Sequence, residues 1–111
     1  MVTYYPKLIE KTILLRNVTS SDISTIVSNN VSTPISKMKD EGVVKAIISV
    51  RTVTPPEETY QMWFETEYEW EVFPSAMSDT DISNLASEVE AVLSGMKERY
   101  IQECVLSVRV V

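Results

Sequence analysis

Four glutamates occupy alternate positions in the stretch FETEYEWEV, which runs from Phe64 to Val72: Glu65, Glu67, Glu69 and Glu71. On a β-strand, side chains two positions apart lie on one face at a spacing of about 7 Å. Two carboxylates at that separation can serve as the acid and the base of an inverting glycoside hydrolysis. Such a row can also hold a metal ion or attract a basic partner.

The uniformity of the row argues against a catalytic or metal site. Acid–base catalysis requires one carboxyl group in an apolar pocket and one in solvent, whereas alternation gives all four glutamates similar surroundings. A metal ion needs several oxygens within about 2.3–2.6 Å, and no aspartate, asparagine or histidine joins the row. Exposed carboxylates about 7 Å apart repel by only ~0.6 kcal/mol in water, so a solvated row is tolerable without a functional reason. We predict no catalytic, cofactor-binding or metal-ligating residue.

The rest of the chain offers little other chemistry. The sequence contains no histidine, and its two glycines, Gly42 and Gly95, cannot form a phosphate-binding loop. The lone cysteine, Cys104, excludes an internal disulfide and is expected in the core. Asp79-Thr80-Asp81 resembles a two-aspartate metal motif, but after Ser78 it is typical of a capped helix start. An enzyme is therefore the less favoured interpretation.

Length and charge limit the class of protein. A chain of 111 residues with 44% hydrophobic and 23% charged residues indicates one globular domain over residues 1–111. The net charge of -6 disfavours direct binding to nucleic acid or to an anionic membrane. No secretory signal and no apolar run of about 20 residues is present, so we expect a cytoplasmic protein.

The hydrophobic periodicity predicts the order β-α-β-β-α-β. Strands are expected at residues 8–18, 43–54, 59–73 and 103–111, and helices at 20–41, as one broken helix or two short ones, and from residue 78 to about residue 100. We expect the first helix to be capped at Ser20, Ser21 or Asp22. This order resembles the ferredoxin-like sandwich, which implies a four-stranded antiparallel sheet of order 4-1-3-2 with both helices on one face. The third strand would be central. A fold of this kind carries no function by itself.

The predicted faces of the sheet differ in character. Tyr68 and Trp70 would point toward the helices, and the glutamates with Trp63 would lie on the helix-free face. A turn near Pro56-Glu57 places Lys45 opposite Glu67 or Glu69, and Arg51 opposite Gln61 or Trp63. The helix-free face also carries apolar side chains, namely Leu14, Ile47, Val53, Trp63 and Val105. An exposed apolar surface of this size is usually shielded from water by another molecule. A homodimer with facing sheets provides this shielding.

The favoured hypothesis is a non-catalytic interaction or regulatory module that acts as a homodimer. Its predicted partner-binding residues are Lys45, Ile47, Arg51, Trp63, Glu65, Glu67, Glu69 and Glu71. The alternative is a small-ligand binder or enzyme of the dimeric α/β-barrel type, with candidates Trp63, Tyr68, Glu65, Glu67 and Arg51. A third hypothesis is an acidic mimic of nucleic acid that occupies a basic protein.

Overall fold

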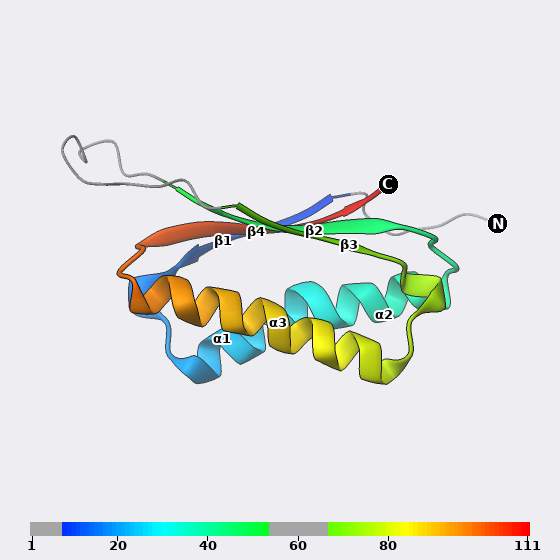
Figure 1. Cartoon of the computed structure of the whole chain (residues 1–111), viewed down its shortest axis with the longest axis horizontal. Coiled ribbons are helices and arrows are strands. Elements are labelled where there is room, and N and C mark those ends of the chain that lie inside the picture. Colours follow the sequence, from blue (N-terminus) through cyan, green and yellow to red (C-terminus); the bar gives the residue numbers. More distant parts are fainter. Residues whose placement is uncertain (1–7, 54–66) are drawn as a thin grey trace.

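One antiparallel sheet, covered by helices on a single face, makes up the part of the chain that the computed structural model describes, residues 8–53 and 67–111 (Figure 1). The strands are β1 (Leu8–Leu14), β2 (Ala46–Thr52), β3 (Glu67–Val72) and β4 (Glu103–Val110). The helices are α1 (Ser20–Val27), α2 (Thr33–Asp40) and α3 (Asp79–Glu98), with the π turn η2 (Ser28–Ser32) and the 3₁₀ turns η1 (Leu15–Asn17) and η3 (Pro74–Ala76). The α+β class and the order of elements agree with the prediction.

The strand order is β1-β4-β2-β3, so the predicted order 4-1-3-2 is wrong and the ferredoxin-like arrangement is not confirmed. The central strands are β2 and β4, whereas β3, which carries Glu67, Glu69 and Glu71, lies at an edge. The glutamates of β3 suit an edge position, because edge strands commonly carry charged side chains that discourage pairing with other chains. The other edge strand, β1, likewise exposes Glu10 and Lys11 in its middle.

The pairing of β2 with β3 also differs from the prediction. Arg51 lies opposite Glu67, and Ser49 lies opposite Glu69. Lys45 forms an ion pair with Glu71, its Nζ lying 2.9 Å from Oε2. The two strands therefore meet in a later register than a turn at Pro56-Glu57 would produce. The predicted alternation of faces nevertheless holds, since residues with even numbers in β2 and β3 face the helices.

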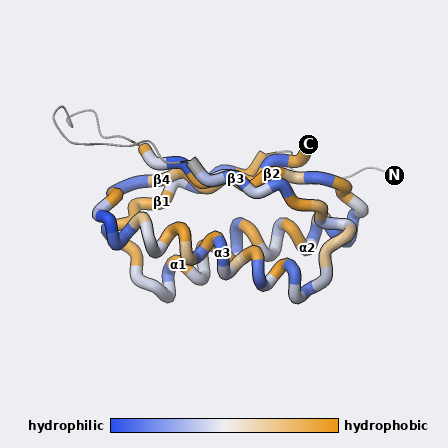
Figure 2. Tube along the Cα trace, viewed as in Figure 1, coloured by the Kyte–Doolittle hydropathy of each residue, from blue (hydrophilic) through white to orange (hydrophobic). Residues whose placement is uncertain are grey.

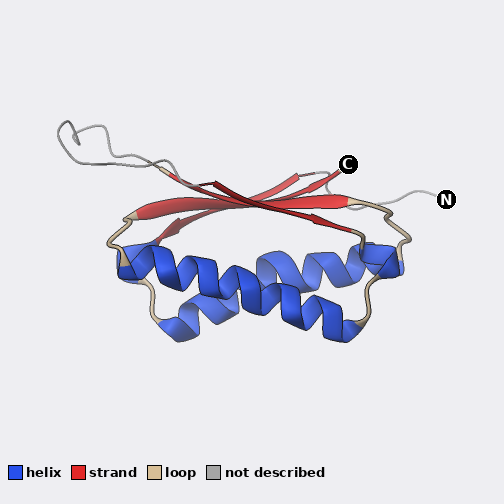
Figure 3. Ribbon diagram, viewed as in Figure 1, coloured by secondary structure: helices blue, strands red, loops and turns tan. Residues whose placement is uncertain are grey.

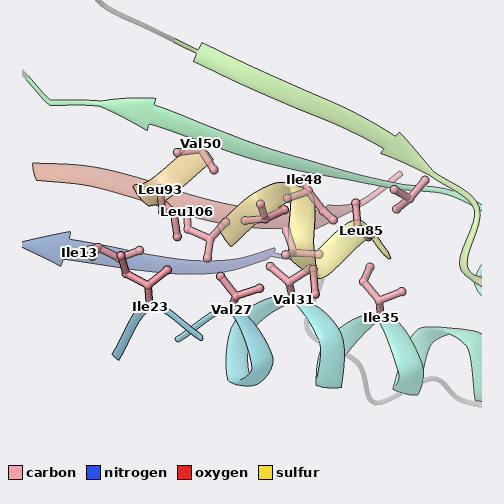
Figure 4. Packing of buried hydrophobic residues seen from close by; sticks show 14 of the residues in the cluster. Ile13, Ile23, Val27, Val31, Ile35, Ile48, Val50, Leu85, Leu93 and Leu106 are labelled. Atoms are coloured by element: carbon pink, nitrogen blue, oxygen red, sulfur yellow. The ribbon is translucent and has the colours of Figure 1, made fainter. Parts of the chain in front are cut away.

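The core lies between the sheet and the helices (Figure 4). Alternate residues of the two central strands are buried, as a sheet covered on one side requires: Ala46, Ile48 and Val50 in β2, and Cys104, Leu106 and Val108 in β4. The hydropathy along the strands alternates accordingly (Figure 2). The predicted core position of Cys104 is confirmed.

A single helical run covers residues 20–40, because α1, η2 and α2 follow one another without a gap. Its N-cap is Thr19 rather than the predicted Ser20, Ser21 or Asp22, and Asp22 completes a capping box with Thr19. The π turn accommodates one residue more than a regular α-helix would. The run ends near Gly42, whose φ of 75° is accessible to glycine without strain.

The described part of the chain consists of two similar halves. The first contains β1, η1, the helical run and β2, and the second contains β3, η3, α3 and β4. The helical run of the first half and α3 of the second half start with the same kind of capping box, at Thr19 and at Ser78, which are 59 positions apart. Each helix is followed by a residue of positive φ, at Gly42 and at Tyr100, an offset of 58 positions. The extra residue of the first half falls in its π turn.

Many side chains match between the halves at these offsets. The identical pairs are Glu10/Glu69, Asp22/Asp81, Ile23/Ile82, Ser24/Ser83, Ser28/Ser87, Val31/Val89, Ser36/Ser94, Met38/Met96, Lys39/Lys97, Ser49/Ser107, Val50/Val108 and Arg51/Arg109. The sheet gives the same correspondence independently, because Ser49 and Ser107 face each other, with Glu69 beside the first and Glu10 beside the second. An approximate two-fold axis therefore passes through the sheet between Ser49 and Ser107.

Candidate interaction surface on the open face of the sheet

The face of the sheet opposite the helices is called the open face here (Figure 3). Its residues alternate with the buried ones along each strand. They are Leu8, Glu10, Thr12 and Leu14 of β1, Glu103, Val105, Ser107 and Arg109 of β4, Ile47, Ser49 and Arg51 of β2, and Glu69 and Glu71 of β3. Lys45, just before β2, lies beside them through its ion pair with Glu71.

A polar row crosses all four strands at the middle of the open face. It runs from Glu10 through Ser107 and Ser49 to Glu69. The two serine hydroxyls form a hydrogen bond with an Oγ–Oγ distance of 2.6 Å, in which either oxygen can be the donor. The two glutamates at the ends of the row are exposed. The row is thus small and neutral at its centre and negative at both ends.

Two arginines lie diagonally across this row. Arg51 is opposite Val105 on β4, and Arg109 is opposite Ile47 on β2. Both arginines are exposed, and neither forms an ion pair with another side chain of the described residues. The approximate two-fold axis exchanges them. The open face therefore presents two cations and two anions in a symmetric arrangement.

Apolar side chains occupy much of the remaining open face. Leu8 and Leu14, on the edge strand β1, are 51% and 48% exposed. Ile47 and Val105, on the central strands, are half-buried. Leu14, Ile47 and Val105 were predicted on this face, and the structure confirms their positions. Uncovered apolar groups beside charges are typical of protein-binding surfaces.

The structure brings together most of the predicted partner-binding residues. Lys45, Ile47, Arg51, Glu69 and Glu71 all lie at the open face. Trp63 and Glu65 lie outside the described residues, and of Glu67 only the backbone is described. Sequence reasoning missed Glu10, Ser49, Ser107 and Arg109 as members of this surface. Comparison of the two halves of the chain would have found them, because each matches a residue of the other half.

The ion pair between Lys45 and Glu71 contributes little to stability. It joins two partly exposed side chains, and pairs of this kind typically contribute less than about 1 kcal/mol. Most of the charge on the open face therefore remains available for interaction with another molecule.

The aromatic residues of β3 lie on the face of the sheet that packs against the helices. Tyr68 and Trp70 pack against the core, with ring centroids 6.4 Å apart and planes inclined by 21°. The indole Nε1 of Trp70 donates a hydrogen bond to Oε1 of Glu88 on α3, at 3.2 Å. The inward direction predicted for these two residues is confirmed. Neither ring is presented on the open face as a stacking platform for a ligand.

Cys104 and the segment at residues 78–81, the two other candidates of the sequence analysis, have structural roles in the core and in a helix cap. Ser78 accepts a hydrogen bond from the backbone N–H of Asp81, which confirms the predicted helix cap. Burial, and secondarily the charge of Glu103, raises the pKa of the Cys104 thiol to about 12, so the thiol is neutral and unreactive at neutral pH. Within residues 8–53 and 67–111, no group of three or more potential ligands is placed to hold a metal ion.

No protein-family model, curated protein or solved structure matches this chain. Among the described helices, none combines the length and the apolar character needed to cross a membrane. The functional argument therefore depends on the open face itself.

Proposed function

We propose that the protein is a non-catalytic interaction or regulatory module that acts as a homodimer through the open face of its sheet. One observation carries the proposal: helices cover only one face, and the other exposes Leu8 and Leu14 beside the half-buried Ile47 and Val105. Each apolar side chain removed from water stabilises an assembly by about 25 cal/mol per Å². A second copy of the sheet presents apolar side chains of the same kind on a surface of the same shape.

The mixed charge of the open face favours self-association over the mimicry of nucleic acid. Lys45, Arg51 and Arg109 lie among its carboxylates, whereas a mimic of a phosphate backbone needs a uniformly negative surface. A surface with both signs of charge can be complementary to a copy of itself.

The size of the open face sets the expected strength of the dimer. Four strands spaced about 4.8 Å apart, each of about seven residues, give a flat footprint of roughly 19 by 23 Å. The corresponding area, about 440 Å², is roughly half the ~800 Å² per partner of a standard interface and falls among weak, transient associations. We therefore expect dissociation constants in the micromolar range, about 1–100 µM, rather than an obligate dimer.

Light scattering and sedimentation over protein concentrations of about 1–500 µM test the proposal. The expected result is a concentration-dependent dimer that Ile47→Glu weakens at least tenfold, because the variant replaces an apolar side chain of the interface by a charge that must lose its water on association. The control is Val44→Glu, since Val44 is exposed and lies before β2, outside the open face. A wild-type protein that stays monomeric over the whole range would contradict the proposal.

A further inference from the structure

Eight of the identical pairs are not buried in either half, and they lie on both layers of the fold. Five are on the helical layer, where Asp22 and Asp81 complete the capping boxes, and three are on the open face. Buried positions match because both halves pack against one core, but exposed positions are under no such constraint, since surface substitutions usually change stability by less than about 0.5 kcal/mol. On the open face, three identical pairs occur nonetheless: Glu10/Glu69, Ser49/Ser107 and Arg51/Arg109. These three pairs are called the symmetric set below. Together they give the open face two glutamates and two arginines that the approximate two-fold axis relates to one another.

The spacing of a β-sheet places the Cα atoms of the four charged residues at equal distances from the approximate axis. With strands about 4.8 Å apart, Glu10 and Glu69 lie about 7.2 Å from the axis, across the strands. Arg51 and Arg109 lie two residues along the central strands, about 6.8 Å along and 2.4 Å across, which is also about 7.2 Å from the axis. The Cα atoms of these residues therefore lie on one circle, on which glutamate and arginine alternate.

We propose that a second copy of this chain docks on the open face so that each glutamate of the symmetric set meets an arginine of the other copy. The inference rests on the proposed homodimer and specifies its register. A two-fold axis lying between the two sheets achieves this register when their strands cross at about 70°, near the orthogonal class of sheet packing. All four glutamate–arginine pairs then form at once, as a self-complementary interface requires.

The centre of the open face suits this approach. Ser49 and Ser107 are small, and they satisfy each other through their 2.6 Å hydrogen bond. Facing sheets pack about 10 Å apart, a gap that an arginine and a glutamate can span together. Arginine and carboxylate form strong paired hydrogen bonds in this situation. Ile47 and Val105 lie between the charged pairs and are covered with them.

A charge exchange between two double variants tests this register. Arg51→Glu with Arg109→Glu makes all four charges of the symmetric set negative, and Glu10→Arg with Glu69→Arg makes all four positive. Each double variant alone is expected to be monomeric, with self-association at least tenfold weaker than in the wild type. An equimolar mixture is expected to form a heterodimer, because every pair is again complementary. All four positions are exposed, so the fold should survive, as circular dichroism would verify.

A matched control changes charge elsewhere by the same amount. Lys37→Glu with Arg99→Glu alters two exposed cations of the helical layer and should leave the dimer intact. If one double variant fails to fold, the single variant Arg109→Glu is mixed in turn with Glu10→Arg and with Glu69→Arg, since the approximate axis allows Arg109 to meet either glutamate. One of the two mixtures is then expected to associate more strongly than its components.

The outcomes separate this inference from the proposed function. A wild-type dimer whose association survives both double variants, or whose variants do not associate on mixing, would overturn the register and leave the homodimer standing. A wild-type protein that is monomeric at every concentration would remove the homodimer and the register together.

Discussion

The extra residue in the first helical run predicts that one deletion is tolerated where its counterpart is not. The π turn at residues 28–32 contains the exposed Asn29, whereas the equivalent part of α3, around Ser87, is regular α-helix. Removing Asn29 would make the first run equal in length to α3 and convert the π turn into an ordinary α-helical turn. Val27 before the deletion and Val31 after it would then keep facing the core, as Ala86 and Val89 do in α3.

The expected cost of this deletion is small. Asn30 donates a 2.8 Å hydrogen bond from Nδ2 to the carbonyl of Ile26, and its loss would cost about 0.5–1.5 kcal/mol. The regular helical hydrogen bonds gained in its place offset part of that. We expect the free energy of unfolding to change by no more than about 1.5 kcal/mol in either direction.

Deletion of Ser87 is the matched control. A residue removed from a regular α-helix turns everything beyond it by about 100°. In α3 the buried residues Val89, Leu93 and Met96 would leave the core together, and each contributes about 1.5–3 kcal/mol. Their combined loss is comparable to the whole stability of a small domain, about 5–15 kcal/mol.

Urea denaturation followed by circular dichroism distinguishes the two deletions. The variant without Asn29 should unfold cooperatively near the wild-type midpoint, and the variant without Ser87 should show no cooperative transition. Equal damage from both deletions would refute the interpretation of the π turn as one accommodated extra residue.

Two further predictions concern backbone conformation and ionisation. Tyr100 is 88% exposed at a φ of 64°, a conformation that costs a non-glycine residue about 1–2 kcal/mol, so Tyr100→Gly should stabilise the protein by about 0.5–1 kcal/mol. Gly42→Ala should destabilise it by about 1 kcal/mol, purely through conformation since its Cβ would meet no atom within 4 Å; urea midpoints that moved the same way in both variants would contradict this. Because the pKa of the Cys104 thiol is raised from 9.0 to about 12, the unfolded chain loses this proton first, and stability should fall as pH rises from about 9 to 12. Cys104→Ala should remove up to about 1.4 kcal/mol per pH unit of that slope, and identical slopes with and without the thiol would count against it.

The sequence predicted the positions and faces of the elements but not the neighbours of each strand. Alternation shows which side of a strand is buried, as it did for Tyr68 and Trp70, because burial selects apolar residues directly. Strand order depends on long-range pairing, and both 4-1-3-2 and 1-4-2-3 allow each β-α-β unit to enclose one other strand. Charge was the available signal, since Glu69, Glu71 and Lys11 mark β3 and β1 as edge strands.

Half of the candidate surface was predictable for the same reason. Ile47, Arg51 and the glutamates of β3 stood out individually as exposed or charged positions on a strand. Ser49 and Ser107 did not, because a lone serine on a strand carries no signal. Their significance appears only when the halves are aligned, and the one-residue difference at the π turn shifts that alignment midway through the chain.

The central position of β4 has a consequence for biosynthesis. β1 and β2 both run antiparallel to β4 and do not pair with each other. In the first half alone, the position between β1 and β2 therefore lacks its strand. Residues 103–110 occupy that position, and they leave the ribosome after every other strand described here. Leu8 therefore pairs with Arg109 only after nearly the whole chain has been synthesised. Pairings so distant along the chain form slowly. A nascent chain stalled before residue 103 would hold β1 without its strand partner, and would leave an unpaired strand edge exposed to aggregation until translation resumed.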